Sequence, residues 1–182
     1  MATSRIGGPA KRVIWPPHCW HMIDEVDLVR LVADHSAWLR LCARLEAMAD
    51  ELPLVPDEDE LFLLRAQVQG LTQPSRVRDD RALDSLFARE RARPLARSLL
   101  DGFHLARTAR IVDVEDILTA LEGEGAAVSA DALGYMIRSF FRGCRSAIAM
   151  EQLALLALGS NRLTADARAL LVERLTESSR PI

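Results

Sequence analysis

Apolar residues recur at steps of three and four along most of this chain, which places them on one face of an α-helix. The clearest run spans residues 133–158. Its repeating positions are Leu133, Ile137, Phe140, Cys144, Ile148, Glu151 and Leu155. Glu151 is therefore a carboxylate on an otherwise apolar face. Because an ionised group in a dry interior is costly unless it is paired, hydrogen-bonded or bound to a metal, we expect Glu151 to have a specific partner.

The same spacing predicts further helices over residues 23–52, 57–69, 78–93, 94–121 and 164–175. Asp24 and Ser129 stand where N-cap residues are expected, Pro53 ends the first helix, and Pro94 begins another. No stretch alternates in the manner of a strand. The sequence therefore predicts an all-α fold: an antiparallel four-helix bundle with a broken second helix and a short additional C-terminal helix.

We expect one domain, residues 23–176, between an irregular N-terminal arm, residues 1–22, and a tail, residues 177–182. The chain has 182 residues, enough to bury a sizeable core. Its N-terminus lacks the apolar stretch of a signal peptide, and no apolar run approaches the ~20 residues of a membrane span. Three cysteines far apart do not form a disulfide framework. These features favour a cytoplasmic protein without a membrane partner.

Charge and motifs argue against several functions. A net charge of −3 gives no basic field, and no helix is basic enough for DNA recognition, so a nucleic-acid partner is not expected. Walker and GxGxxG loops, GxSxG and HExxH are absent. Cys42 and Cys144 lie on apolar faces, where burial raises the pKa of a thiol and makes it unreactive. The sequence favours a protein that is not an enzyme.

Two histidines, like Glu151, are ionisable residues on otherwise apolar helix faces. His35 lies on the apolar face of the helix over residues 23–52, and His104 lies on that of residues 94–121. A lone histidine in such a position is more often a hydrogen-bonded core residue than a metal ligand. Three ionisable groups on three helices are either a working site or what remains of one.

The N-terminal arm carries Trp15 and Trp20, which are too apolar for a free tail. We therefore expect the arm to pack on the bundle or to dock on a protein partner. His18, Cys19 and His21 are close in the sequence but lack the second half of a metal site. A packing or surface role is expected for them.

Several stretches give a resemblance to a known family. DHSAWLRLCARLEAMADELP, residues 34–53, resembles the first helix of hemerythrin-like, or HHE cation-binding, domains. GYMIRSFFRGCRSAIAMEQLALLAL, residues 134–158, resembles their last core helix, and NRLTADARALLVERL resembles the terminal helix that follows. DSLFARERARPL and FHLARTA are similar to their second and third helices. The resemblance implies a four-helix bundle around a di-iron centre, in proteins that bind or sense oxygen, nitric oxide, redox state or iron.

By this resemblance, His35 matches a ligand on the first helix, His104 a ligand on the third, and Glu151 the carboxylate on the fourth. Asp84, or Asp80 one turn before it, matches the second helix. These four positions, with Asp84 for the second helix, are the candidate metal ligands.

The chain also departs from the family pattern. Ala147 stands where a histidine is expected four residues before Glu151, and no histidine occurs between His35 and His104. Two irons need more imidazole and carboxylate ligands than remain, so an ordinary di-iron centre is not expected. A single iron or zinc ion bound by His35, His104 and Glu151 stays open. So does a metal-free core in which these side chains satisfy one another.

Three functions follow, in decreasing order of expectation. The first is a non-enzymatic regulatory or protein-interaction protein on a hemerythrin-like bundle that has lost its di-iron site, with a protein partner or a second copy of the chain bound to it. The second is a sensor or iron-handling protein with an unusual metal site. The third is a helical regulator associated with DNA.

Overall fold

The computed structural model describes residues 22–73, 84, 86–123 and 128–178. The described residues form five α-helices and one short 3-10 helix, η2: α1 Glu25–Glu51, α2 Glu58–Thr72, η2 Glu90–Ala92, α4 Pro94–Leu121, α5 Ala130–Leu158 and α6 Ala165–Ser178. Within this part there is no strand, only an isolated bridge between Ile23 and Leu163. The all-α prediction is confirmed. The N-terminal arm, apart from Met22, lies outside the described residues.

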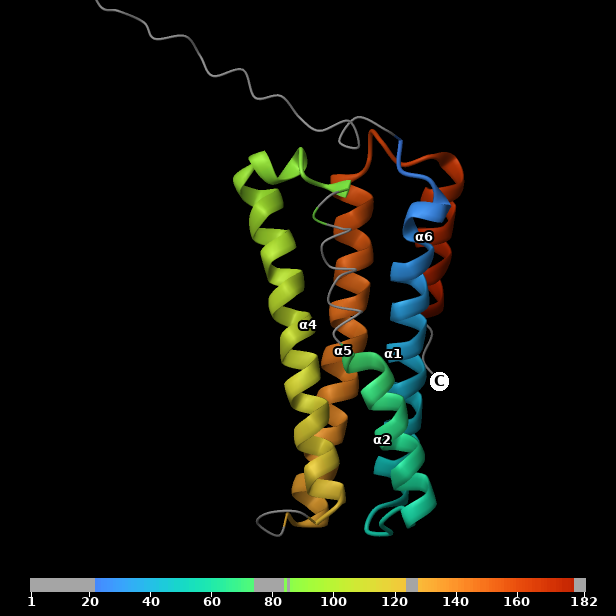
Figure 1. The fold of residues 1–182 in the computed structure, drawn as a ribbon, viewed down its shortest axis with the longest axis vertical. Coiled ribbons are helices and arrows are strands. Elements are labelled where there is room, and N and C mark those ends of the chain that lie inside the picture. The colour runs from blue at the N-terminus through green and yellow to red at the C-terminus, as the bar shows by residue number, and fades with distance from the viewer. Residues whose placement is uncertain (1–21, 74–83, 85, 124–127, 179–182) are drawn as a thin grey trace, which may run out of the picture.

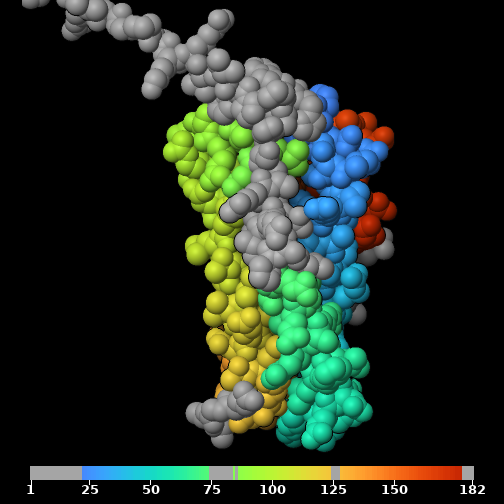
Figure 2. All heavy atoms as spheres, viewed as in Figure 1, coloured from blue at the N-terminus to red at the C-terminus, as the bar shows by residue number. Residues whose placement is uncertain are grey.

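Three long helices, α1, α4 and α5, run side by side along the whole length of the molecule (Figure 1). α2 covers only the lower half in this view, where it contacts α1 and α4. α6 packs against the upper halves of α1 and α5. Successive helices run in opposite directions, and α2 lies in front of the lower half (Figure 2). None of the described helices is both long enough and apolar enough to cross a bilayer.

The ends of the helices follow the expected capping chemistry. Asp24 and Asp27 form a reciprocal capping box at the start of α1, and Ser129 caps α5. Two backbone hydrogen bonds join the start of α1 to the loop before α6. The N–H of Ile23 donates to the carbonyl of Arg162, and the N–H of Thr164 donates to the carbonyl of Ile23. The helix over 94–121 has the predicted bounds because Pro94 suits the first helical position.

Two segments differ from the prediction. The last helix continues to Ser178, past its predicted end at residue 175 and into the predicted tail. Of the predicted helix over 78–93, residues 84 and 86 are helical, residues 87–89 form a turn and η2 follows, while residues 74–83 and 85 lie outside the description. Arg93 has an extended backbone, as expected for a residue before proline. The buried pair of Glu90 and Arg162 holds this turn against the loop between α5 and α6.

Apolar side chains gather in two clusters. The upper core comprises Ile23, Leu28, Leu31, Phe87, Leu100, Leu155, Leu163, Ala167 and Leu171. The lower core includes Trp38, Leu41, Leu45, Leu64, Ile117, Phe140 and Ile148. Between the two clusters lies a band of polar side chains, which we call the polar layer: His35, Arg107, Arg110, Glu151 and Gln152. The polar layer interrupts the apolar packing in the middle of α1, α4 and α5.

Candidate functional site

The centre of the polar layer is a contact between His35 on α1 and Glu151 on α5. Their Nε2 and Oε2 atoms are 3.0 Å apart, and the two residues are only 2% and 1% exposed. The amide nitrogen of Gln152 lies 3.4 Å from Nδ1 of His35. Because that amide donates, Nδ1 is the acceptor, and the imidazole proton lies on Nε2 and is donated to Glu151.

Two arginines from α4 complete the layer. Nη2 of Arg107 lies 2.5 Å from Oε1 of Glu151, and Nη2 of Arg110 lies 3.7 Å from Oε2. The guanidinium of Arg110 also lies over the ring of Trp38, 5.5 Å from its centroid. Burial alone raises the pKa of Glu151, but the His35 hydrogen bond and the charge of Arg107 outweigh it and hold this pKa below its ordinary value. Glu151 is thus a buried anion with both oxygens bound.

The polar layer does not fit a metal centre. Both carboxylate oxygens of Glu151 already accept hydrogen bonds, and Nε2 of His35 donates its proton instead of offering a lone pair. Two guanidinium groups stand where a cation would bind. Each pair of like unit charges repels by about 4 kcal/mol at 4 Å with an effective dielectric constant of about 20, and a divalent ion would double that. Arg107 and Arg110 supply the positive charge that Glu151 requires.

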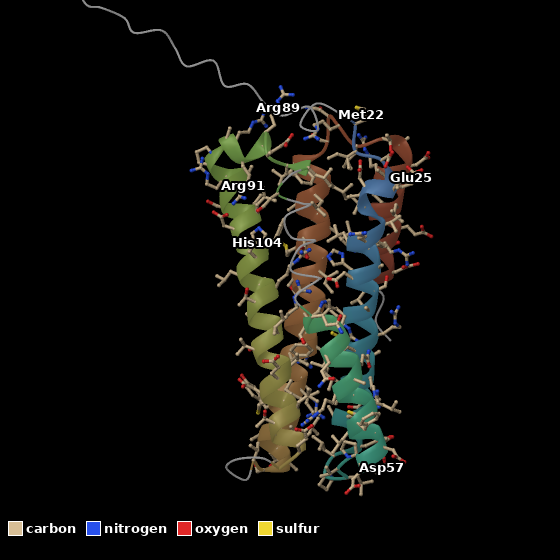
Figure 3. The ribbon with its side chains drawn as sticks, in the orientation of Figure 1. Met22, Glu25, Asp57, Arg89, Arg91 and His104 are labelled. Atoms are coloured by element: carbon tan, nitrogen blue, oxygen red, sulfur yellow. The ribbon has the colours of Figure 1, made fainter. Side chains whose placement is uncertain are left out.

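His104 forms a separate pair with Asp84. Nε2 of His104 is 3.1 Å from Oδ1 of Asp84, and both side chains are about one third exposed. The other oxygen of Asp84 binds Arg91, which also binds Asp101. His104 and Arg91 lie on the upper part of the molecule, at α4 and just before it (Figure 3). Within the described ranges, no group of three or more His, Cys, Asp or Glu side chains could hold a metal ion.

The four candidate ligands are therefore brought together in two pairs, His35 with Glu151 and His104 with Asp84. The other candidates, Asp80 in the second helix and His18, Cys19 and His21 in the arm, lie outside the described residues.

The sequence interpretation missed the arginines and Gln152. A signal was present, because Arg107 and Arg110 continue the spacing that runs from Leu100 through His104 along the inner face of α4. An arginine is usually solvated, so the spacing alone does not assign Arg107 or Arg110 to the interior. Gln152 adjoins Glu151 on α5 and is 1% exposed.

Cys42 and Cys144 face each other between α1 and α5 within the lower core. The hydrogen bond between the thiols, together with burial, raises the pKa of Cys42. The same hydrogen bond lowers the pKa of Cys144, helped by the charge of Arg110 and opposed by burial. Burial thus raises the pKa of both thiols, as expected, but at Cys144 the hydrogen bond and the charge of Arg110 outweigh burial, so the net pKa of Cys144 is lowered.

Comparison of the chain with protein-family models, with curated proteins and with solved structures found no match. The resemblance to hemerythrin-like domains therefore stays a prediction from the residues.

Proposed function

We propose that this protein is a hemerythrin-like four-helix bundle in which side-chain ion pairs have replaced the metal centre. It acts as a non-enzymatic regulatory or protein-interaction protein of the cytoplasm. The observation that carries this proposal is the binding of both Glu151 oxygens, one by His35 and one by Arg107. A carboxylate that matches the family's metal ligand is satisfied here by the protein itself.

Arg107 and Arg110 also account for how Glu151 can stay buried although Ala147 stands where the family pattern has a histidine. With Ala147 in place of the expected ligand, Glu151 would be an uncompensated charge in a core, which is strongly destabilising. Arg107 and Arg110 remove that cost because they approach from α4 and neutralise the carboxylate. The polar layer is then a structural element that fixes how α1, α4 and α5 face one another, and the bundle remains as a scaffold for contacts.

A surface for a protein partner lies at the turn between α1 and α2. Four large apolar side chains are exposed in this turn and in the first half of α2: Leu54 at 73%, Val55 at 61%, Phe62 at 70% and Leu63 at 56%. Asp57, the N-cap residue of α2 at the end of this turn, marks the lower end of the molecule (Figure 3). Clustered apolar exposure is typical of interaction surfaces. The N-terminal arm stays a second predicted docking segment, and a second copy of the chain is the alternative partner.

One observation favours the alternative, a sensor with a single iron or zinc ion. Oε1 of Gln152 is buried and has no hydrogen-bond partner among the described residues, so an amide oxygen is left near His35 and Glu151. The charges of Arg107 and Arg110 count against a cation at this place. We therefore rank the metal-free protein first.

Metal analysis of the full chain, purified from cells grown with added iron and zinc, tests the proposal. We expect well below one metal ion per chain. One ion per chain that is lost in His35→Ala and kept in His104→Ala would support the sensor. Two irons per chain with an oxo-bridge absorption band would overturn the loss of the di-iron site. DNA binding at low salt, which we do not expect, would support a DNA-associated regulator.

A further inference from the structure

The register of α1 and α5 places Cys42 directly opposite Cys144. His35 on α1 contacts Glu151 on α5, and the two helices run in opposite directions (Figure 1). Cys42 follows His35 by seven residues and Cys144 precedes Glu151 by seven, so both cysteines lie two helical turns below that contact. Both are free, and a hydrogen bond joins their thiols. Two thiols in contact on packed helices are the arrangement from which a disulfide forms.

Access from solvent differs between the two thiols. Cys144 is 1% exposed and lines an open groove of about 400 Å³ between α4 and α5. The groove continues up to the helix backbone beside Cys144, because a Cβ added at Gly143 would meet no atom within 4 Å. A water molecule needs only about 10 to 15 Å³ of such space, so a small oxidant fits easily. Cys42 is 0% exposed and does not line the groove.

The surrounding charges favour the same sulfur. The Cys42 thiol donates a hydrogen bond that lowers the pKa of Cys144, and the charge and hydrogen bond of Arg110 add to this effect against burial. The pKa of Cys42 is raised by the same contact between the thiols and by burial. Since the thiolate is the nucleophilic form of cysteine, Cys144 is the more reactive of the two as well as the one beside the groove.

We propose that Cys144 is a site of oxidation by hydrogen peroxide and that Cys42 then forms a disulfide with it. The Cys144 thiolate attacks one peroxide oxygen, so that an S–O bond forms and the O–O bond breaks. The departing hydroxide takes up the proton that the thiol released, which leaves a sulfenic acid and water. Cys42 attacks the sulfenic sulfur, an S–S bond forms, the S–O bond breaks, and the hydroxide leaves as water with the Cys42 proton. Two electrons pass from the two thiols to the peroxide.

The disulfide would tie α1 to α5 two turns below the polar layer. Oxidation also removes the thiolate beside Arg110, whose guanidinium approaches Glu151, so the state of the thiols acts on the charges of the polar layer. A disulfide of this kind is reversible by thiol reductants. This inference goes beyond the proposed function, because it holds whether or not a metal ever bound the polar layer.

Treatment of the reduced, folded full chain with hydrogen peroxide at neutral pH, followed by mass spectrometry, tests the proposal. We expect the loss of two hydrogen atoms, a Cys42–Cys144 disulfide by peptide mapping, and its reversal by dithiothreitol. Cys19→Ser removes the third cysteine and should give the same bond. The assignment is overturned if no Cys42–Cys144 bond forms, or if both thiols are oxidised only after urea has unfolded the chain.

Single variants in the Cys19→Ser background separate the two roles. In Cys42→Ala the sulfur of Cys144 should gain oxygen, as sulfenic or sulfinic acid, because no second thiol is present to form the disulfide. In Cys144→Ala the thiol of Cys42 should stay reduced. Circular dichroism shows whether each variant folds. Oxidation of Cys42 in Cys144→Ala as fast as that of Cys144 in Cys42→Ala would contradict the assigned roles.

A further pair of variants tests the groove as the route of the oxidant. Gly143→Leu places a side chain in the groove beside Cys144 and should slow its oxidation several-fold. Gly102→Leu makes the same change at an exposed glycine of α4 outside the groove and should leave the rate unchanged. An unchanged rate in a folded Gly143→Leu variant would overturn this route and the order of the two sulfurs that rests on it.

Discussion

The imidazole of His35 and the carboxylate of Glu151 meet 3.0 Å apart in the interior, although 116 residues separate them in the sequence. This contact joins α1 to α5 at the level where the upper and lower cores are divided. Because each side chain would be a costly buried polar group without the other, only one alignment of the two helices satisfies both. Arg107 and Arg110 extend the same constraint to α4.

Replacing the Glu151 carboxylate by an amide should destabilise the folded protein. In Glu151→Gln the buried carboxylate that Arg107 and Arg110 approach is replaced by a neutral amide, so its charge no longer balances theirs. We expect the free energy of unfolding to fall by about 3 to 5 kcal/mol. Urea unfolding followed by circular dichroism measures this change.

Glu46→Gln is the matched control. Glu46 pairs with Arg145 between α1 and α5, but its side chain is 30% exposed, so its loss should cost at most about 1 kcal/mol. If Glu151→Gln is no more destabilising than Glu46→Gln, the polar layer is not the buried ion cluster described here.

The two histidines should behave differently because their surroundings differ. His35→Ala removes a buried ring and takes away the hydrogen bonds that His35 makes with Oε2 of Glu151 and with the Gln152 amide, so we expect a loss of about 2 kcal/mol or more. His104→Ala breaks a pair that is about one third exposed and should cost less than about 1 kcal/mol. Thermal and urea unfolding of both variants provide the comparison. Equal losses would mean that His104 has a structural role as large as that of His35.

The ion pair of Glu46 predicts a defined dependence on pH. The hydrogen bond from Arg145 lowers the pKa of Glu46 in the folded protein, so the unfolded chain takes up this proton first as the solution is acidified. The contribution of the pair is therefore complete above the unfolded pKa of about 4.3 and is lost as pH falls through the lower folded pKa. The difference in unfolding free energy between wild type and Glu46→Gln should shrink between about pH 5 and pH 3. A difference that grows over this interval would contradict the assigned pair.

Two glycines should respond to alanine in opposite directions. Gly143 lies in the exposed interior of α5 with open space around it, so Gly143→Ala should stabilise the protein by about 0.5 to 1 kcal/mol. At Gly159 a Cβ would come within 2.9 Å of the Leu163 side chain and 3.0 Å of the Leu155 carbonyl oxygen. Gly159→Ala should therefore destabilise it. Melting temperatures by calorimetry test both signs, and a rise for Gly159→Ala would show that this loop has room to move.

Helix positions could be predicted from the sequence because their signals are local. Capping residues at Asp24 and Ser129 and the proline at Pro94 fix helix starts through their own backbone chemistry. The apolar spacing placed His35 and Glu151 inside, and the structure confirms that both are buried. The end of α6 could not be fixed, since helix ends fray and no glycine or proline follows directly.

The partners of the buried groups could not be predicted in the same way. Whether Arg107 faces solvent or Glu151 depends on how α4 is rotated against α5, which is set by tertiary packing. His104 illustrates the same limit: it shares the apolar spacing of α4, yet its side chain is 34% exposed and pairs with Asp84. Periodicity assigns a face to within about one residue, which is too coarse to decide which polar groups meet.

The most direct measurement is a crystal structure of the protein soaked in ferrous iron and in zinc, with anomalous scattering recorded at each metal edge. The account predicts no anomalous peak in the polar layer, with Arg107 bound to Glu151 and His35 on the opposite oxygen. An anomalous peak about 2.0 to 2.2 Å from both Nε2 of His35 and a Glu151 oxygen, with the arginines displaced, would contradict it.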